Sequence, residues 1–185
     1  MNTVRIKPLT YVAVLLAASF AGTTMAANNM DKAQYDSAVA RADADYKVAH
    51  AKCETLRGDA ETICEKDAKA AKVAAHAHAK AMRDGTPGAV AEAREDTAEA
   101  RYDAAKERCK QLSGNDKDVC IKAAKLKETV AEENAKADKK SAEAGMQRDE
   151  NIEQSRYKLE LEKCDSLAGD SKDACQAQAK AAYKP

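Results

Sequence analysis

The chain has 185 residues with 31 basic and 31 acidic side chains, so its formal net charge at pH 7 is zero. This balance argues against nucleic acid or acidic lipid as the main partner, because both attract a surplus of Lys and Arg. Large apolar residues are scarce, whereas good helix formers such as Ala, Lys and Glu are abundant. The composition therefore predicts an all-α protein without a thick hydrophobic core.

The first 26 residues have the pattern of a secretory signal peptide. Arg5 and Lys7 form a short basic region, an apolar run follows from Leu9 to Ala21, and small residues lead up to Ala26. The apolar run is short for a membrane span, so we expect cleavage after Ala26 rather than a retained anchor helix. The sequence thus predicts a protein that is periplasmic or secreted and has no stable membrane span after cleavage.

One motif occurs three times in the rest of the chain. Residues 102–120 read YDAAKERCKQLSGNDKDVC, and the same spacing of Tyr, Cys, Leu, Gly, Asp or Asn, and Cys is found at residues 46–64 and 157–175. Apolar residues on both sides of each turn follow steps of three and four, as on one face of a helix. We therefore predict three antiparallel helical hairpins, at residues 27–84, 85–145 and 146–185, the last one truncated.

In the first hairpin, the expected helix faces are given by two series of residues. They are Tyr35, Val39, Ala42, Tyr46, Ala49, Cys53 and Leu56 before the turn, and Cys64, Ala68, Ala71, Ala75, His78 and Met82 after it. Gly58 is expected to end the first helix in a left-handed conformation and Asp59 to cap the second. Residues 84–88, DGTPG, form the strongest break in the chain after the signal peptide.

The second hairpin repeats this layout. Its expected faces are Ala91, Ala98, Tyr102, Ala105, Cys109 and Leu112 before the turn, and Val119, Ala123, Leu126 and Val130 after it. Gly114 is expected to end the first helix, and Asn115 to cap the next with Asp118 three residues on. We expect a kink or turn at Gly145, although a single glycine costs only about 1 kcal/mol in a helix and an unbroken helix is the alternative.

The third hairpin has Tyr157, Cys164 and Leu167 in register, a turn at Gly169 and Asp170, and a short return helix that begins near Cys175. The truncation is typical of a terminal repeat that caps an array. The motif tyrosines, Tyr46, Tyr102 and Tyr157, each lie seven residues before a cysteine. We expect them to cover the disulfides on the helix interface; the alternative is an exposed row with a binding role.

The cysteines are expected to form one disulfide within each hairpin. In every copy the first Cys lies five residues before the turn glycine and the second lies six after it, so antiparallel helices bring the two together. The predicted pairs are Cys53–Cys64, Cys109–Cys120 and Cys164–Cys175. Each bridge would stabilise a core-poor hairpin by about 3 kcal/mol. The spacing is that of neither a Cys-x-x-Cys redox site nor a zinc site.

No sequence motif points to catalysis or to a cofactor. His76 and His78 are two residues apart, so on a helix they point in different directions and cannot chelate one ion together. The residue opposite His50 is expected near Asp67, far from His76. The acidic and basic residues alternate at spacings that suit ion pairs on a solvated helix face. We find no nucleophile motif and no phosphate-binding loop, and we expect no enzyme activity, no cofactor and no metal site.

Two runs, AEAREDTAEARYDAAKER and KLKETVAEENAKADKKSAEA, carry a resemblance to known proteins. They resemble the exported Ala-, Lys- and Glu-rich helical proteins of Gram-negative bacteria that are often labelled cell-envelope or TolA-like. The repeated cysteine pairs and the cleavable leader depart from TolA, so a role in bridging two membranes is not implied. The prediction is a non-enzymatic envelope interaction or support protein whose partner is itself or another envelope protein. The alternative is a scavenger of metals or stress ligands that uses the dispersed carboxylates and histidines.

Overall fold

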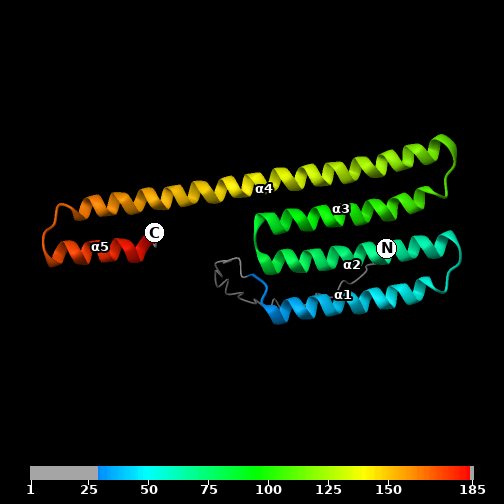
Figure 1. Ribbon diagram of the computed structural model, residues 1–185, viewed down its shortest axis with the longest axis horizontal. Coiled ribbons are helices and arrows are strands. Elements are labelled where there is room, and N and C mark those ends of the chain that lie inside the picture. Colours follow the sequence, from blue (N-terminus) through cyan, green and yellow to red (C-terminus); the bar gives the residue numbers. More distant parts are fainter. Residues whose placement is uncertain (1–28, 184–185) are drawn as a thin grey trace, which may run out of the picture.

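The computed structural model describes residues 29–183, and the predicted signal peptide lies outside them. The described residues form five α-helices and no strand, which confirms the all-α prediction (Figure 1). The helices are α1 (Lys32–Cys53), α2 (Asp59–Asp84), α3 (Pro87–Cys109), α4 (Gly114–Cys164) and α5 (Asp170–Tyr183).

The first four helices lie side by side in a single layer, in the order of the chain (Figure 1). Consecutive helices contact each other, and within the described residues no other pair of helices does. The helix α4 extends far beyond α3, and α5 folds back along this extension on the same side of α4 as α3. The molecule is therefore an elongated array of three disulfide-stapled hairpins: α1 with α2, α3 with the first part of α4, and the last part of α4 with α5.

Alanine and disulfide-bonded cysteine make up the interior of this layer. The buried apolar residues of the described chain are all Ala or Cys, and Cys53, Cys109 and Cys164 are its largest fully buried side chains. Small side chains let neighbouring helices approach closely, but each buries little apolar area. Apolar burial therefore contributes little to the stability of this layer, and other elements, above all the disulfides, must stabilise it.

Two helix starts are fixed by side-chain caps. Asp31 Oδ1 accepts a hydrogen bond from the Gln34 N–H at 2.8 Å, and the Asp31 N–H donates to Gln34 Oε1 at 3.1 Å, which completes a capping box at α1. Thr86 caps α3, where Pro87 occupies the first helical position. The predicted break after Asp84 is confirmed, because α2 ends there and Gly85 follows with a left-handed φ of 62°.

The motif glycines begin the return helices, so the prediction that they end the outgoing helices is wrong. The outgoing helices α1, α3 and the last part of α4 end at Cys53, Cys109 and Cys164, five residues before the glycines. A hydrogen-bonded turn follows each of these cysteines. The backbone N–H of Leu56, Leu112 and Leu167 donates to the carbonyl of the cysteine three residues earlier.

The glycines nevertheless have the positive φ that a left-handed residue requires. Gly58, Gly114 and Gly169 have φ angles of 62°, 53° and 56°. The predicted caps Asp59, Asn115 and Asp170 lie inside the first turn of α2, α4 and α5, so they do not cap. Gly58 occupies the N-cap position of α2, and Ser113 occupies that of α4. At the start of α5, the Gly169 carbonyl accepts hydrogen bonds from the N–H groups of Lys172 and Asp173. Asp59 and Asp170 still suit the positive end of the helix dipole.

The chain does not turn at Gly145, and α4 continues through it for 51 residues in total. The alternative of an unbroken helix is therefore the correct one. The physical reason is that the helix lacks a second break signal there, in contrast to residues 84–88 with their proline and two glycines. As a consequence, the second and third hairpins share one helix.

Several predicted core positions of α2 and α4 are in fact exposed. The helix α2 buries Ala68, as predicted, together with Ala70, Ala77, Ala79 and Ala81, whereas Ala71, Ala75, His78 and Met82 face solvent. The reason is that α2 lies between α1 and α3 and packs on two sides, so one stripe cannot describe it. The helix α4 packs on one side, yet its contact side carries Ala124, Glu128 and Ala135 rather than the predicted residues.

Candidate interaction surface

The three predicted disulfides are all present. Cys53–Cys64, Cys109–Cys120 and Cys164–Cys175 have Cα–Cα distances of 5.4, 5.7 and 5.6 Å. Each bridge joins the last residue of an outgoing helix to the second turn of the return helix. Among the described residues no free cysteine remains, so the motif supplies a covalent link at the closed end of each hairpin.

The motif tyrosines are half-buried, so each ring contacts the hairpin and keeps part of its surface in solvent. A lysine ammonium from the return helix lies over two of the rings, Lys72 at 5.1 Å from the Tyr46 centroid and Lys125 at 5.2 Å from the Tyr102 centroid. Cation–π contacts of this kind hold the ring against the neighbouring helix. The rings of Tyr46 and Tyr102 thus join the two helices of the first and second hairpins, and they also border solvent.

His50 and His76 contact different carboxylates and do not come together. His76 Nε2 lies 3.0 Å from Asp43 Oδ1, and His50 Nε2 lies 3.7 Å from Glu65 Oε1. The carboxylate opposite His50 is therefore Glu65, while the predicted neighbour Asp67 pairs with Arg108 of α3. In the described part of the chain, no three His, Cys, Asp or Glu side chains are grouped so that they could hold a metal ion.

The carboxylate of Asp43 is the best-connected acidic group between α1 and α2. A hydrogen bond from the Lys72 ammonium, at 2.8 Å, lowers the pKa of Asp43 below its ordinary value, and a contact with His76 acts in the same direction. Partial burial of the carboxylate raises its pKa and is the second-largest effect, but it does not cancel the lowering by Lys72 and His76. This cluster ties α1 to α2 and has the character of a structural ion pair rather than of a catalytic site.

A groove of about 870 Å³ runs over one face of the layer. The helix α3 forms its floor, and α2 and α4 form its two walls. Most of the lining is apolar or small: Ala74, Ala81, Met82, Val90, Ala93, Ala98, Ala105, Ala124 and Ala131. The floor extends from Val90 to Ala105, about 22 Å at the helical rise of about 1.5 Å per residue.

Basic side chains border this groove. Arg94, Arg101 and Lys127 line it, together with His78. Arg94 pairs with Asp138, whereas Arg101 and Lys127 have no ion-pair partner among the described residues. The groove therefore combines an apolar floor with unpaired positive charge at its edge.

One carboxylate reaches the interior beside the groove. Glu128 is 6% exposed and is the only buried charged residue of the described chain. Its Oε2 atom lies 2.6 Å from Lys125 Nζ, yet it makes no hydrogen bond of acceptable geometry. The ammonium nevertheless compensates the charge of Glu128, and the carboxylate in turn raises the pKa of Lys125. The Lys125 ammonium thus links Glu128 to the face of Tyr102.

The sequence did not reveal this groove, because the heptad pattern assigned Met82 and His78 to a helix interface. Three consecutive antiparallel helices in a flat layer, α2, α3 and the first part of α4, create the groove. No local sequence signal distinguishes a flat layer from a closed bundle. The predicted disulfide and turn residues lie at the far ends of the hairpins and do not line it. Of the predicted motif residues, Tyr102 alone does.

Comparison of the chain with models of known protein families, with curated proteins and with solved structures gives no match. Among the described residues, no helix has the combination of length and apolar character that crossing a bilayer requires.

Proposed function

We propose that this protein is a non-enzymatic, exported interaction protein of the cell envelope that binds an amphipathic helix of another protein in the groove over α3. The observation that carries the proposal is the groove itself, with its alanine-rich floor and the unpaired Arg101 and Lys127 at its edge. These charges favour a partner helix that carries acidic residues beside its apolar face.

The dimensions of the groove suit a helix better than a small molecule. Its floor of about 22 Å corresponds to four turns of helix. The groove is open along its length, so a helix would insert one face and keep the other in solvent, as amphipathic helices do in hydrophobic grooves. A helix bound there would lie on α3 and contact α2 and α4 on either side.

The export that we propose has separate support. Three disulfides in a chain of this size suit an oxidising compartment. The leader pattern at residues 1–26 points to the same route. Mass spectrometry of the protein recovered from fractionated bacterial cells tests the export: we expect an N-terminus at Ala27 and a periplasmic or extracellular fraction. A cytoplasmic protein that still carries residues 1–26 would contradict it.

The groove is tested with synthetic helical peptides of about 15 residues, the length that matches its floor. Two peptides share one apolar face, and their polar face carries either Glu or Lys. We expect fluorescence anisotropy to show binding of the Glu peptide and at least tenfold weaker binding of the Lys peptide, a difference of about 1.4 kcal/mol. Equal binding of both peptides, or of neither, would contradict the proposal.

Charge reversal at the groove edge sharpens this test. The variant Arg101→Glu/Lys127→Glu should lose the Glu peptide and gain the Lys peptide, because the edge charges then have the opposite sign. The matched control is Lys66→Glu/Lys69→Glu, which reverses two lysines beside a different hollow that includes Asp96, Glu99 and Asp103. The control should bind the peptides as the native protein does.

A further inference from the structure

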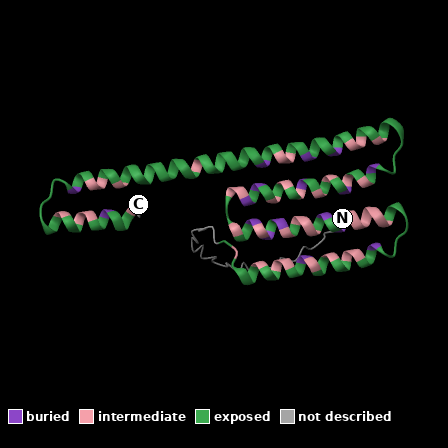
Figure 2. Cartoon of the chain, viewed as in Figure 1, coloured by how far each residue is buried: buried purple, intermediate pink, exposed green. Residues whose placement is uncertain are grey.

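The edge of α4 that faces away from α3 and α5 is unpartnered over the whole length of the helix. Figure 1 shows α3 and α5 on the same side of α4, and Figure 2 shows exposed residues along most of the helix. The buried positions of α4 are Ala124, Glu128, Ala135 and Cys164. At about 3.6 residues per turn, these four lie within a narrow sector that faces α3 and α5.

A stripe of apolar and small residues lies on the opposite side of α4. We call it the outer stripe; it consists of Val119, Ala123, Leu126, Val130, Ala137, Ser141, Ala144, Arg148, Ile152, Ser155 and Leu159. At about 3.6 residues per turn, all of them fall within about a quarter of the helix circumference. Its large members are well exposed, with Leu126 at 64%, Leu159 at 56% and Val119 at 55%.

The outer stripe is selectively depleted of charge. The helix α4 has 23 charged residues among 51, whereas Arg148 is the only charged residue in the 11 positions of the stripe. A solvated face of such a charge-rich helix would carry about five. Charge depletion together with exposed Val, Leu and Ile is the pattern of a surface that becomes buried in a complex.

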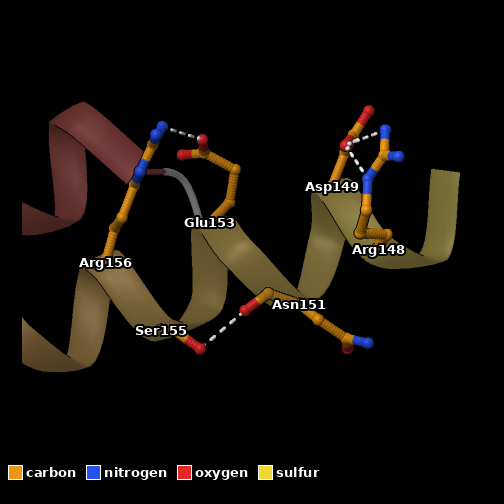
Figure 3. Close-up of polar contacts among 6 residues, drawn as sticks. All are labelled: Arg148, Asp149, Asn151, Glu153, Ser155 and Arg156. Carbon is orange, nitrogen blue, oxygen red and sulfur yellow. Dashed lines mark hydrogen bonds and ion pairs between the residues drawn. The ribbon is translucent and has the colours of Figure 1, made fainter. Parts of the chain in front are cut away.

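Two polar groups of the stripe, those of Arg148 and Ser155, already have partners within α4 (Figure 3). The Arg148 guanidinium pairs with Asp149 at 2.9 Å, and the Ser155 hydroxyl donates to the Asn151 carbonyl oxygen at 2.8 Å. A polar group that is buried without a hydrogen-bond partner lowers the stability of a complex. Because these two side chains already have partners within α4, burying the stripe would not leave them unsatisfied. Arg148 can therefore lay its aliphatic stem on the interface while its charged end stays at the margin.

Four of the five large apolar residues of the stripe are arranged symmetrically about the middle of the helix, and the fifth, Val130, has Arg148 at its symmetric position. Lys139 is the central residue of α4, 25 positions from either end. Val119 and Leu159 lie 20 positions on either side of it, and Leu126 and Ile152 lie 13 positions on either side. Two copies of α4 placed antiparallel about this centre would set Val119 against Leu159 and Leu126 against Ile152, each twice.

We propose that the outer stripe of α4 binds a second copy of this chain, antiparallel, with a two-fold axis that crosses the stripe between Ala137 and Ser141, at the level of Lys139 along the helix. A two-fold axis requires a surface that is complementary to itself, and the symmetric stripe meets that requirement. Between residues 119 and 159 the stripe is about 60 Å long, and at a width of about 10 Å two copies bury about 1,200 Å² in total. This area is at the lower end of the range of specific interfaces.

Charges beside the stripe are compatible with this register. On one flank, Lys127 comes near Asp149 of the second copy, and Asp116 comes near Lys163 of the second copy. On the other flank Lys122 meets Lys158, where solvent screens the repulsion. The pairing deepens the proposed interaction role by naming one partner. Of the residues that line the groove over α3 it involves Lys127, whereas the residues substituted to test it, Leu126 and Ile152, do not line the groove. Failure of the peptide test and failure of the pairing are therefore distinguishable.

Analytical ultracentrifugation of the protein purified after export tests the pairing. We expect a dimer with a micromolar or tighter dissociation constant. Leu126→Glu and Ile152→Lys should each weaken the dimer at least about thirty-fold, because each places a charge at a central apolar contact. A native protein that stays monomeric at about 100 μM would overturn the proposal, as would single variants that dimerise like the native protein.

A double variant tests the register. In Leu126→Glu/Ile152→Lys each new Glu faces a new Lys of the second copy, so we expect the dimer to return to within about tenfold of the native affinity. Restoration would also show that the single variants fold. A double variant as weak as the single ones would overturn the antiparallel register. The control is Met146→Glu, at a residue of α4 that is 62% exposed but lies off the outer stripe; it should leave the dimer unchanged.

Discussion

Cys53, Cys109 and Cys164 are each the last residue of an outgoing helix, and each is almost completely buried. Their pairing could be predicted because the repeat fixes both the turn and the distance of each cysteine from it. The exact helix ends could not be predicted, since a positive φ suits the end of one helix and the start of the next equally well. The positive φ of the turn glycines was thus predicted correctly, whereas their place at the end of the outgoing helices was not.

Gly58 has a φ of 62° and a ψ of −135°, a conformation that residues with a side chain rarely adopt. Gly58→Ala should therefore lower the free energy of unfolding by about 1 to 2 kcal/mol. No heavy atom lies within 4 Å of the added Cβ, so the cost is conformational rather than steric. Urea unfolding followed by circular dichroism measures it, and an unchanged midpoint would show that the turn adapts.

Asp43 should make stability depend on pH in a defined direction. Because its pKa is lowered in the folded protein, its contribution is present above the ordinary aspartate pKa and is lost as the pH falls through the folded value. Asp43→Asn should thus lower the thermal midpoint slightly at pH 7 and leave it unchanged at about pH 2. A decrease that is larger at low pH would contradict this assignment.

The control for this measurement is Asp45→Asn. Asp45 lies two residues further along α1, its side chain is 76% exposed, and its contact with Arg41 is 3.9 Å long. An exposed pair of that length contributes little. The thermal midpoint of this variant should follow that of the native protein at both pH values.

At the scale of the element, α4 shows where pattern reasoning fails. The heptad rule placed Val119, Leu126 and Val130 against the neighbouring helix, on the assumption that large apolar residues point inward. The structure packs α4 through Ala124 and Ala135 instead, because small side chains allow close approach to an α3 that is itself lined with alanine. Apolar periodicity identified the residues of the stripe correctly. It could not show that they face away from the neighbouring helix of the same chain.

Gly145 offers a test of the continuous helix. The structure leaves open space where a Cβ would stand and gives this glycine no positive φ. Gly145→Ala should therefore raise helical content and stabilise the protein by up to about 1 kcal/mol, the opposite sign to Gly58→Ala. If Gly145 instead formed a turn of the kind seen at Gly85, the same substitution would destabilise the protein.

At the scale of the whole molecule, composition and repeats predicted helical hairpins, disulfides and an elongated form. They did not predict a flat layer, because the order of packing between hairpins depends on contacts such as Arg108 with Asp67 and Arg94 with Asp138, which join residues more than 40 positions apart. The flat layer matters for function, since it leaves both the groove over α3 and the outer stripe of α4 open to partners.

The central claim is that the disulfides hold together a helical array whose alanine interior is too thin to do so alone. Far-UV circular dichroism of the oxidised protein and of the protein with all six thiols reduced tests it most directly. With about 3 kcal/mol lost per bridge, reduction should abolish cooperative unfolding and most of the helical signal, apart from residual helix in the long, charge-paired α4. A reduced protein that keeps its helical signal and its unfolding midpoint would contradict the account.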